Sequence, residues 1–143
     1  MWIAILIFIF SILIMFLWAR HRMEQKIVKK GGLELKYSKL IEQLIKFNHE
    51  EGVSNLEIKK KSNSWLNIFI DRVGTIALFQ IIMTFQTLTI VFKIKFISTG
   101  KIEKIEWNFP KEEDQEYMAN KINNDIFLFF KKHYQYLNNY FNT

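Results

Sequence analysis

The apolar run at the start of the chain limits its fold more than any other feature of the sequence. Residues 2–19 contain no charged side chain and one serine. As a helix rising about 1.5 Å per residue, a run of this length reaches about 27 Å, close to the hydrocarbon thickness of a bilayer. Trp2 and Trp18 stand at its two ends, where aromatic rings favour the headgroup region. The run therefore predicts a single transmembrane helix that serves as an uncleaved signal anchor.

A cleaved signal peptide and a buried soluble helix both fit the run less well. A cleaved signal peptide begins with basic residues and has small residues before its cleavage site. This run has no basic side chain before it and ends in Trp18-Ala19-Arg20. A soluble helix that is apolar on all sides needs a much larger protein around it. We therefore expect a transmembrane anchor at residues 1–19.

The residues after the run predict its orientation. Cytoplasmic flanks of membrane helices are rich in Lys and Arg, and basic residues can also attract anionic lipid headgroups. We therefore expect the N-terminus outside the cell and the rest of the chain in the cytoplasm, on the inner (plasma) membrane of a bacterium. Apart from Glu24, the charged residues between 20 and 30 are all basic: Arg20, Arg22, Lys26, Lys29 and Lys30.

The composition of the remaining chain excludes several classes of protein. Residues 31–143 carry 15 basic and 13 acidic side chains, too balanced for the broad basic face that nucleic acids require. The absence of cysteine excludes a disulfide scaffold, a thiolate metal site and a cysteine nucleophile. Because 50% of the chain is hydrophobic and 16% is aromatic, it is not intrinsically disordered. A folded domain that does not bind nucleic acid is expected.

Hydrophobic periodicity indicates how this domain begins. We divide the chain into an anchor at 1–19, a basic juxtamembrane segment at 20–32 and a folded domain at 33–143. Apolar residues recur at intervals of three and four over 33–47, which predicts an amphipathic helix that ends before Gly52.

Alternating apolar and polar residues then predict a series of strands. The alternation is strictest over residues 87–96, where one face would be buried and the other solvated. Lys59–Lys61 precede a turn, and we expect them to protect an edge strand. Strand patterns occur around 56–58, 65–72, 74–82, 86–97 and 101–109.

A long helix is expected at the C-terminus. Pro110 suits a first helical turn, and the acidic residues at 112–116 fit the positive end of the helix dipole. Apolar positions recur on one side as far as Phe141. The predicted fold class is α+β: a transmembrane helix, then a small two-layer domain of helix, antiparallel meander of four to five strands, and long C-terminal helix.

Residues 73–92 leave a second interpretation open. These twenty residues carry no charge, so they are long enough to form another transmembrane helix. Ten of the twenty are Val, Ile or Thr, which favour strands. Gln80 and Gln86 would also be costly in hydrocarbon unless they faced a partner helix. We prefer two buried strands; a second span would place the C-terminal helix outside the cell.

Signals for catalysis are weak. His21, His49 and His133 lack partners at metal-ligand spacing. An acidic helix start accounts for the carboxylates at 112–116, and neither a phosphate-binding loop nor a nucleophile elbow is present. We expect no catalytic residue, no metal site and no cofactor, and we do not expect an enzyme.

The aromatic C-terminal helix suggests a partner. One of its sides can cover the sheet, and the other is either buried as well or needs a partner. Phe129, Tyr136 and Tyr140 are the candidate contact residues. The leading hypothesis is a membrane-anchored, non-enzymatic binding or adaptor protein that presents its domain to another protein at the inner membrane surface. The sequence does not determine the oligomeric state.

The alternative hypothesis is a tethered domain that binds or senses a lipid or another small apolar ligand. A curved sheet closed by a helix can enclose such a ligand. Gln80, Thr84 and Gln86 would then supply its few polar contacts.

Overall fold

The structure, a computed structural model, describes residues 7–15, 17–18, 31–49 and 53–141; the side chains at 48, 49, 54 and 134–141 are outside this description. Residues 7–15 are helical, and their large apolar side chains are exposed. Over the described residues, no helix combines the length and apolar character needed to cross a bilayer. The remainder of the predicted anchor and the basic residues at 20–30 lie outside the described residues.

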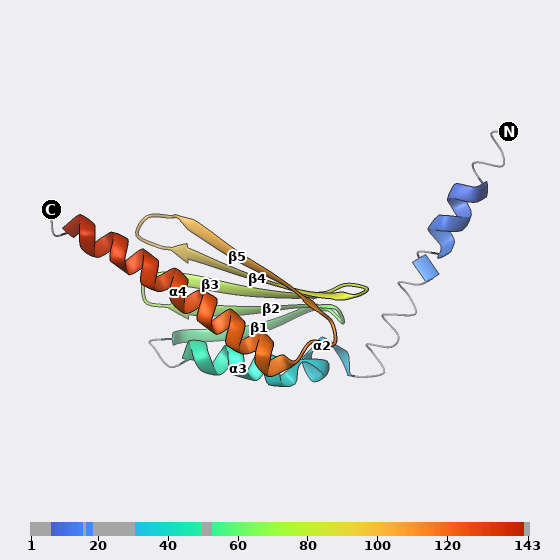
Figure 1. Cartoon of the computed structure of the whole chain (residues 1–143), viewed down its shortest axis with the longest axis horizontal. Helices are drawn as coiled ribbons and strands as arrows, with labels where there is room; N and C mark the ends of the chain where they lie inside the picture. Colours follow the sequence, from blue (N-terminus) through green and yellow to red (C-terminus); the bar gives the residue numbers. More distant parts are fainter. Residues whose placement is uncertain (1–6, 16, 19–30, 50–52, 142–143) are drawn as a thin grey trace.

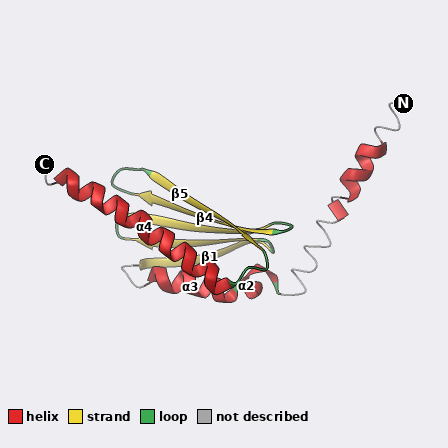
Figure 2. Ribbon diagram, viewed as in Figure 1, coloured by secondary structure: helices red, strands yellow, loops and turns green. Residues whose placement is uncertain are grey.

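From residue 31 onward the chain forms an α+β domain (Figures 1 and 2). This confirms the predicted order of helix, antiparallel meander and long C-terminal helix. The elements are α2 (Gly32–Lys36), α3 (Ser38–His49), β1 (Val53–Ser62), β2 (Trp65–Arg72), β3 (Thr75–Met83), β4 (Thr87–Phe96), β5 (Ile102–Pro110) and α4 (Gln115–Phe141).

The five strands form one sheet in sequence order, each antiparallel to the next. β1 and β5 are its edges, so Lys59–Lys61 lie on an edge strand as expected. Residues 73–92 contain β3 and the first part of β4. The interpretation of this uncharged segment as two strands is therefore confirmed, and β4 continues past it to Phe96.

One face of the sheet carries the hydrophobic core. Side chains alternate along a strand, and every second residue of β2, β3 and β4 is buried against the helices. Phe79 and Phe92 pair across β3 and β4 with ring centroids 4.8 Å apart. Leu40 and Leu44 from α3 and Ile122 from α4 belong to the same buried cluster. Both helices therefore cover the same face (Figure 1).

A break at Tyr37 divides the predicted first helix into α2 and α3. In a continuous helix the Leu40 N–H would donate to the Lys36 carbonyl. Instead, the Gln115 side chain from α4 lies between them: Leu40 N donates to Gln115 Oε1 at 3.1 Å, and Gln115 Nε2 donates to Lys36 O at 2.9 Å. A side chain inserted into the helical ladder is a known cause of helix kinks. The prediction of one uninterrupted helix was wrong at this point.

The last helix begins later than predicted. Pro110 ends β5, where it pairs with Thr87 of β4, and α4 starts at Gln115. Asp114 Oδ1 accepts a hydrogen bond from Tyr117 N at 2.8 Å, so Asp114 caps the helix. Proline is tolerated here because it lies in an edge strand. The acidic residues at 112–114 therefore precede the helix and do not form its first turn.

Candidate functional site

The sheet face that points away from the helices is the main candidate for a binding surface. We call it the open face, because no helix among the described residues covers it (Figure 1). Its central side chains come from β2, β3 and β4, since their neighbours in sequence point into the core. They are Trp65, Asn67, Phe69, Leu78, Gln80, Ile82, Thr89, Val91 and Lys93, and Lys93 pairs with Leu78 across β3 and β4.

The open face carries more apolar side chains than the usual solvated side of a two-layer sheet, although Asn67 pairs with Gln80 in its middle and Lys93 pairs with Leu78. An antiparallel sheet with one face in water normally alternates apolar and polar residues. In β3, however, Leu78 and Ile82 are apolar although they point away from the core. Trp65 pairs with Ile82, and Phe69 pairs with Leu78, across β2 and β3. This double-sided apolar character explains why residues 73–92 resemble a membrane span in sequence.

Lysine and tryptophan side chains order the β1 side of the open face. Trp65 Nε1 donates a hydrogen bond to Asn67 Oδ1 at 2.9 Å. The ammonium of Lys61 lies 4.9 Å from the Trp65 ring centre, and that of Lys59 lies 5.3 Å from the Phe69 ring centre, within the range of cation–π attraction. Asn67 is only 2% exposed, so neighbouring side chains on this face already shield it from water.

Paired charges border the apolar centre on both edge strands. On β1, Lys59 lies 3.1 Å from Glu57; on β5, Lys104 lies 2.6 Å from Glu106. The hydrogen bond from Lys104 lowers the pKa of Glu106, so this carboxylate is ionised at neutral pH. Thr89 Oγ1 donates to Asn108 Oδ1 at 2.7 Å. An apolar centre with a polar border is the usual anatomy of a protein–protein interface.

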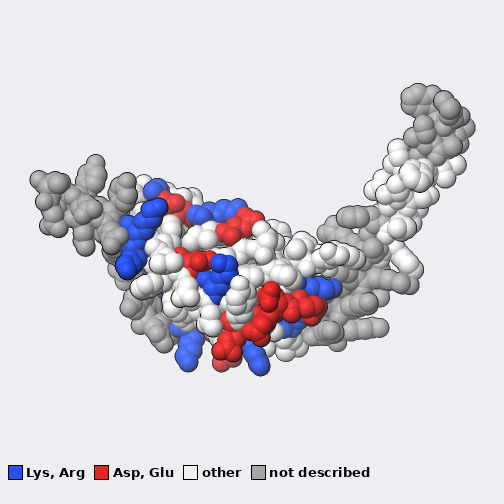
Figure 3. Space-filling model, viewed as in Figure 1, with Lys and Arg blue, Asp and Glu red and all other residues white. Residues whose placement is uncertain are grey.

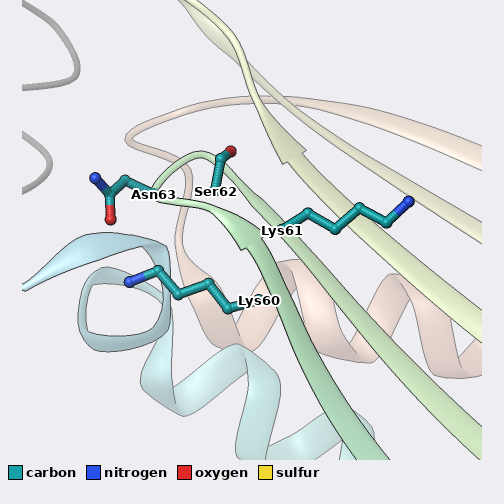
Figure 4. A pocket seen from close by; sticks show the side chains of 4 residues that line it. All are labelled: Lys60, Lys61, Ser62 and Asn63. Carbon is teal, nitrogen blue, oxygen red and sulfur yellow. The ribbon is translucent and has the colours of Figure 1, made fainter.

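A second feature lies at the turn between β1 and β2. Lys60, Lys61, Ser62 and Asn63 line an open cavity of about 380 Å³ there (Figure 4). Lys60 extends toward α2, whereas Lys61 extends the opposite way (Figure 4). The pairing of β1 with β2 shifts by one residue between Lys60 and Ser62, which is a β-bulge of the kind common in edge strands.

Phe129, the first of the predicted partner contacts, packs within the domain. Its side chain is partly buried against the core, and its ring centre lies 5.5 Å from that of Phe130. The side chains of Tyr136 and Tyr140 lie outside the description, although α4 includes both positions. Their role as partner contacts stays a prediction.

The three predicted ligand-pocket residues do not line the layer between the sheet and the helices. Gln80 is on the open face, since its neighbours Phe79 and Ile81 belong to the core. Thr84 and Gln86 are exposed in the turn between β3 and β4. The structure thus places all three away from α4, and the layer itself is occupied by fully buried side chains such as Phe92.

Sequence reasoning missed the residues that α4 does expose. Phe127 and Leu128 are both exposed on this helix, as is Tyr117 near its start. Ile122 and Ile126 mark the side of α4 that faces the core. The positions of the exposed residues on other sides of the helix could therefore have been read from the helical period.

The described histidine and carboxylate side chains make contacts that stabilise the fold. His133 stacks on Phe96, with ring centres 4.8 Å apart. The pKa of Glu103 is lowered mainly by its hydrogen bond from Lys101, and the positive charge of Lys101 adds to this effect. Among the side chains that the structure describes, none of the His, Asp and Glu residues form a group of three that could hold a metal ion. Of the residues predicted to mark the membrane interface and the topology, Trp18 is exposed. The others lie outside the described residues: Trp2, Arg20, Arg22, Lys26, Lys29 and Lys30.

Acidic side chains gather around the beginning of α4, as Figure 3 shows. One of them, Glu112, pairs with Lys36 of α2 at 3.0 Å.

In comparisons with protein-family models, with curated proteins and with solved structures, no match to this chain is found. The features that indicate a function are therefore the open face, the turns and the charged side chains described above.

Proposed function

We propose that the chain is a single-pass, membrane-anchored binding protein without enzymatic activity, whose α+β domain recognises another protein at the inner surface of the plasma membrane. The observation that carries this proposal is the group of apolar side chains on the open face, Trp65, Phe69, Leu78, Ile82 and Val91, which no described helix covers. A large apolar patch on a soluble domain commonly marks an interaction site. Trp65 and Phe69 supply the aromatic side chains on which interface energy tends to depend.

The anchor is supported by the character of the first residues. The run at 2–19 has no charge, and the large apolar side chains described between Ile7 and Trp18 are at least half exposed. Exposure of this kind on all sides of a helix is unfavourable in water and favourable in lipid. The five basic residues between 20 and 30 support a cytoplasmic domain. This location would restrict the search for a membrane-bound partner to a surface.

A protein partner fits the geometry better than an enclosed apolar ligand. The layer between the sheet and α4 contains Phe79, Phe92 and Ile122, each at most 1% exposed. These side chains occupy the space that a small ligand would need. The open face, by contrast, is broad and bordered by the ion pairs of β1 and β5. Such a surface suits contact with another folded protein.

Site-specific photo-crosslinking in host cells tests this proposal. A photoreactive amino acid replaces Ile82 on the open face of the full chain, and in a second sample it replaces Lys132 on α4. We expect a discrete protein adduct from position 82 and none from position 132. The adduct should disappear in the Leu78→Lys variant, because a second lysine beside Lys93 would replace an apolar contact and would lose hydration in the interface.

Leu128→Lys is the matched control, since it places the same charge on an exposed position of α4. It should leave the adduct from position 82 unchanged. Adducts only from position 132, with sensitivity to Leu128→Lys, would move the binding surface to α4. The absence of a protein adduct from either position would contradict the adaptor function. Circular dichroism checks that both variants keep the fold.

A further inference from the structure

The chain enters the domain through two glycines that fix the geometry of its first turn. Gly31 and Gly32 both have positive φ, at 81° and 83°, a conformation that favours glycine. A Cβ at Gly31 would overlap the Leu35 side chain, and a Cβ at Gly32 would lie 3.2 Å from Lys60 Nζ. The backbone N–H of Leu33 donates to Asn63 O at 3.2 Å. The entry point is therefore held against the β1–β2 turn.

The same end of the sheet carries the β3–β4 turn. Met83 N donates to Ser64 O at 2.8 Å, which joins this turn to the β1–β2 turn. We call the group of Gly31–Leu35, Lys60–Ser64 and Thr84–Gln86 the entry end. The opposite end contains the β2–β3 turn with Val73 and Gly74, and it lies about 30 Å away because strands extend about 3.4 Å per residue.

Two large apolar side chains of the entry end are exposed. Leu35 is 66% exposed on α2, and Phe85 is 58% exposed in the β3–β4 turn. Thr84 N donates to Thr87 O at 2.8 Å, so this turn is closed by a hydrogen bond and holds Phe85 at its tip. Phenylalanine and leucine in such positions can enter the headgroup–acyl boundary of a bilayer.

Charge on the entry end is mixed: α2 carries the exposed Glu34 beside Leu35, and the other charges lie on two sides. Lys60 and Lys61 lie on the β1 side, where they line the open cavity of about 380 Å³ with Ser62 and Asn63 (Figure 4). The acidic side chains gather instead near the beginning of α4 (Figure 3). An anionic surface would therefore attract the β1 side and repel the start of α4.

We propose that the entry end lies against anionic phospholipids of the bilayer, with Phe85 and Leu35 in the headgroup region and Lys60 and Lys61 bound to lipid phosphates. This inference rests on the proposed membrane anchor. Residues 20–30 can span at most about 40 Å at about 3.5 Å per residue, so the entry end, where the chain enters the domain at Gly31, stays within about that distance of the anchor. The open face then points along the membrane, toward a neighbouring protein.

The chain has no cysteine, so a single introduced cysteine can report on lipid contact. The full-length Phe85→Cys variant, labelled with an environment-sensitive fluorophore, is reconstituted in nanodiscs of phosphatidylcholine with or without phosphatidylglycerol. Val73→Cys serves as the control because Val73 is 92% exposed at the opposite end. We expect lipid-borne quenchers to reduce the emission severalfold more at position 85 than at position 73, and only with phosphatidylglycerol.

The lysine contribution is tested in the Phe85→Cys background. Lys60→Gln with Lys61→Gln should return the quenching to the level seen in phosphatidylcholine alone. Lys131→Gln with Lys132→Gln, which removes two exposed lysines of α4, should leave it unchanged.

Three results would overturn the inference. Equal quenching at positions 85 and 73 in a chain that enters the nanodiscs would show that the anchor is correct and the lipid-facing surface is not. Quenching that persists without phosphatidylglycerol, or in the Lys60 and Lys61 variant, would reject anionic lipid as the contact. A chain that fails to enter nanodiscs would refute the anchor and, with it, this orientation of the domain.

Discussion

At the scale of single residues, Tyr37 joins three parts of the domain. It follows α2, and its hydroxyl donates a hydrogen bond to Lys111 O at 2.7 Å, beyond the end of β5. The same hydroxyl lies 3.6 Å from the sulfur of Met83 on β3. Because the side chain is almost fully buried, its phenol cannot exchange these contacts for water. Tyr37 therefore ties the first helix to the strands at the entry end.

This burial makes stability sensitive to alkaline pH. Burial, with a smaller contribution from the negative charge of Glu112, raises the pKa of Tyr37 from 10.0 to about 12. In the unfolded chain the phenol loses its proton near its ordinary pKa, whereas the folded chain retains it. The contribution to stability is therefore complete below pH 10.0 and declines as the pH rises toward about 12.

Tyr37→Phe tests this dependence. At neutral pH the variant should lose on the order of 1–2 kcal/mol, because Lys111 O is left without its donor. Between pH 10.0 and about 12 the difference from the parent chain should shrink, since phenylalanine has no proton to lose. Thermal unfolding of the detergent-solubilised full chain, followed by circular dichroism across this range, measures both effects. If the stabilities of the variant and the parent chain changed in parallel with pH, Tyr37 would not be the source of the alkaline sensitivity.

At the scale of secondary-structure elements, Gln115 determines where the first helix breaks. Its amide both accepts from Leu40 N and donates to Lys36 O. Because one group of the amide donates and the other accepts, it replaces the helical hydrogen bond that is missing between α2 and α3. The break thus depends on the start of α4, and the two helices are coupled by one side chain.

Gln115→Ala should destabilise the domain by on the order of 1–3 kcal/mol, because two backbone groups in a partly buried site lose their partner. Gln115→Glu should also be destabilising at neutral pH, since a carboxylate cannot donate to Lys36 O, and acid should restore part of the loss. Asn120→Ala, which removes an exposed amide from the same helix, is the control. Thermal unfolding of the full chain measures each change. If the Gln115→Ala variant were as stable as this control, α2 and α3 would be able to form one continuous helix with no loss of stability.

These examples show which parts of the fold were accessible from sequence. The strands were predictable because each face imposes its own alternation, as over Thr87–Phe96. The break at Tyr37 was not, because Gln115 lies 75 residues from Leu40 in sequence. The same limit applies to the open face: periodicity marks β3 as apolar on both sides, but only the placement of α3 and α4 shows which side stays uncovered. In the same way, the side of α4 that packs against the sheet determines which of its residues, such as Leu128, are exposed.

At the scale of the whole molecule, three surfaces have separable roles. One face of the sheet stabilises the fold by packing against the helices. We propose that the open face binds a partner and that the entry end meets the bilayer. Because these surfaces come from different sides of the same strands, substitutions such as Leu78→Lys and Lys60→Gln should affect partner binding and lipid contact independently. If residues 2–19 anchor the domain as proposed, residues 20–30 would limit the orientations in which the open face can meet a partner.

The division between anchor and domain predicts how the separated parts behave. The core draws on α2 to α4 and all strands from β2 to β5, so residues 31–143 contain what the fold requires. Expressed alone, this fragment should be soluble without detergent and give a mixed α/β circular dichroism spectrum, whereas the full chain should require detergent. Size-exclusion chromatography with light scattering should show one species, and Leu78→Lys should reverse any self-association through the open face. A fragment that is mostly helical and depends on detergent would contradict both the single span and the autonomous domain, because β3 and β4 could then not form the centre of a water-soluble sheet.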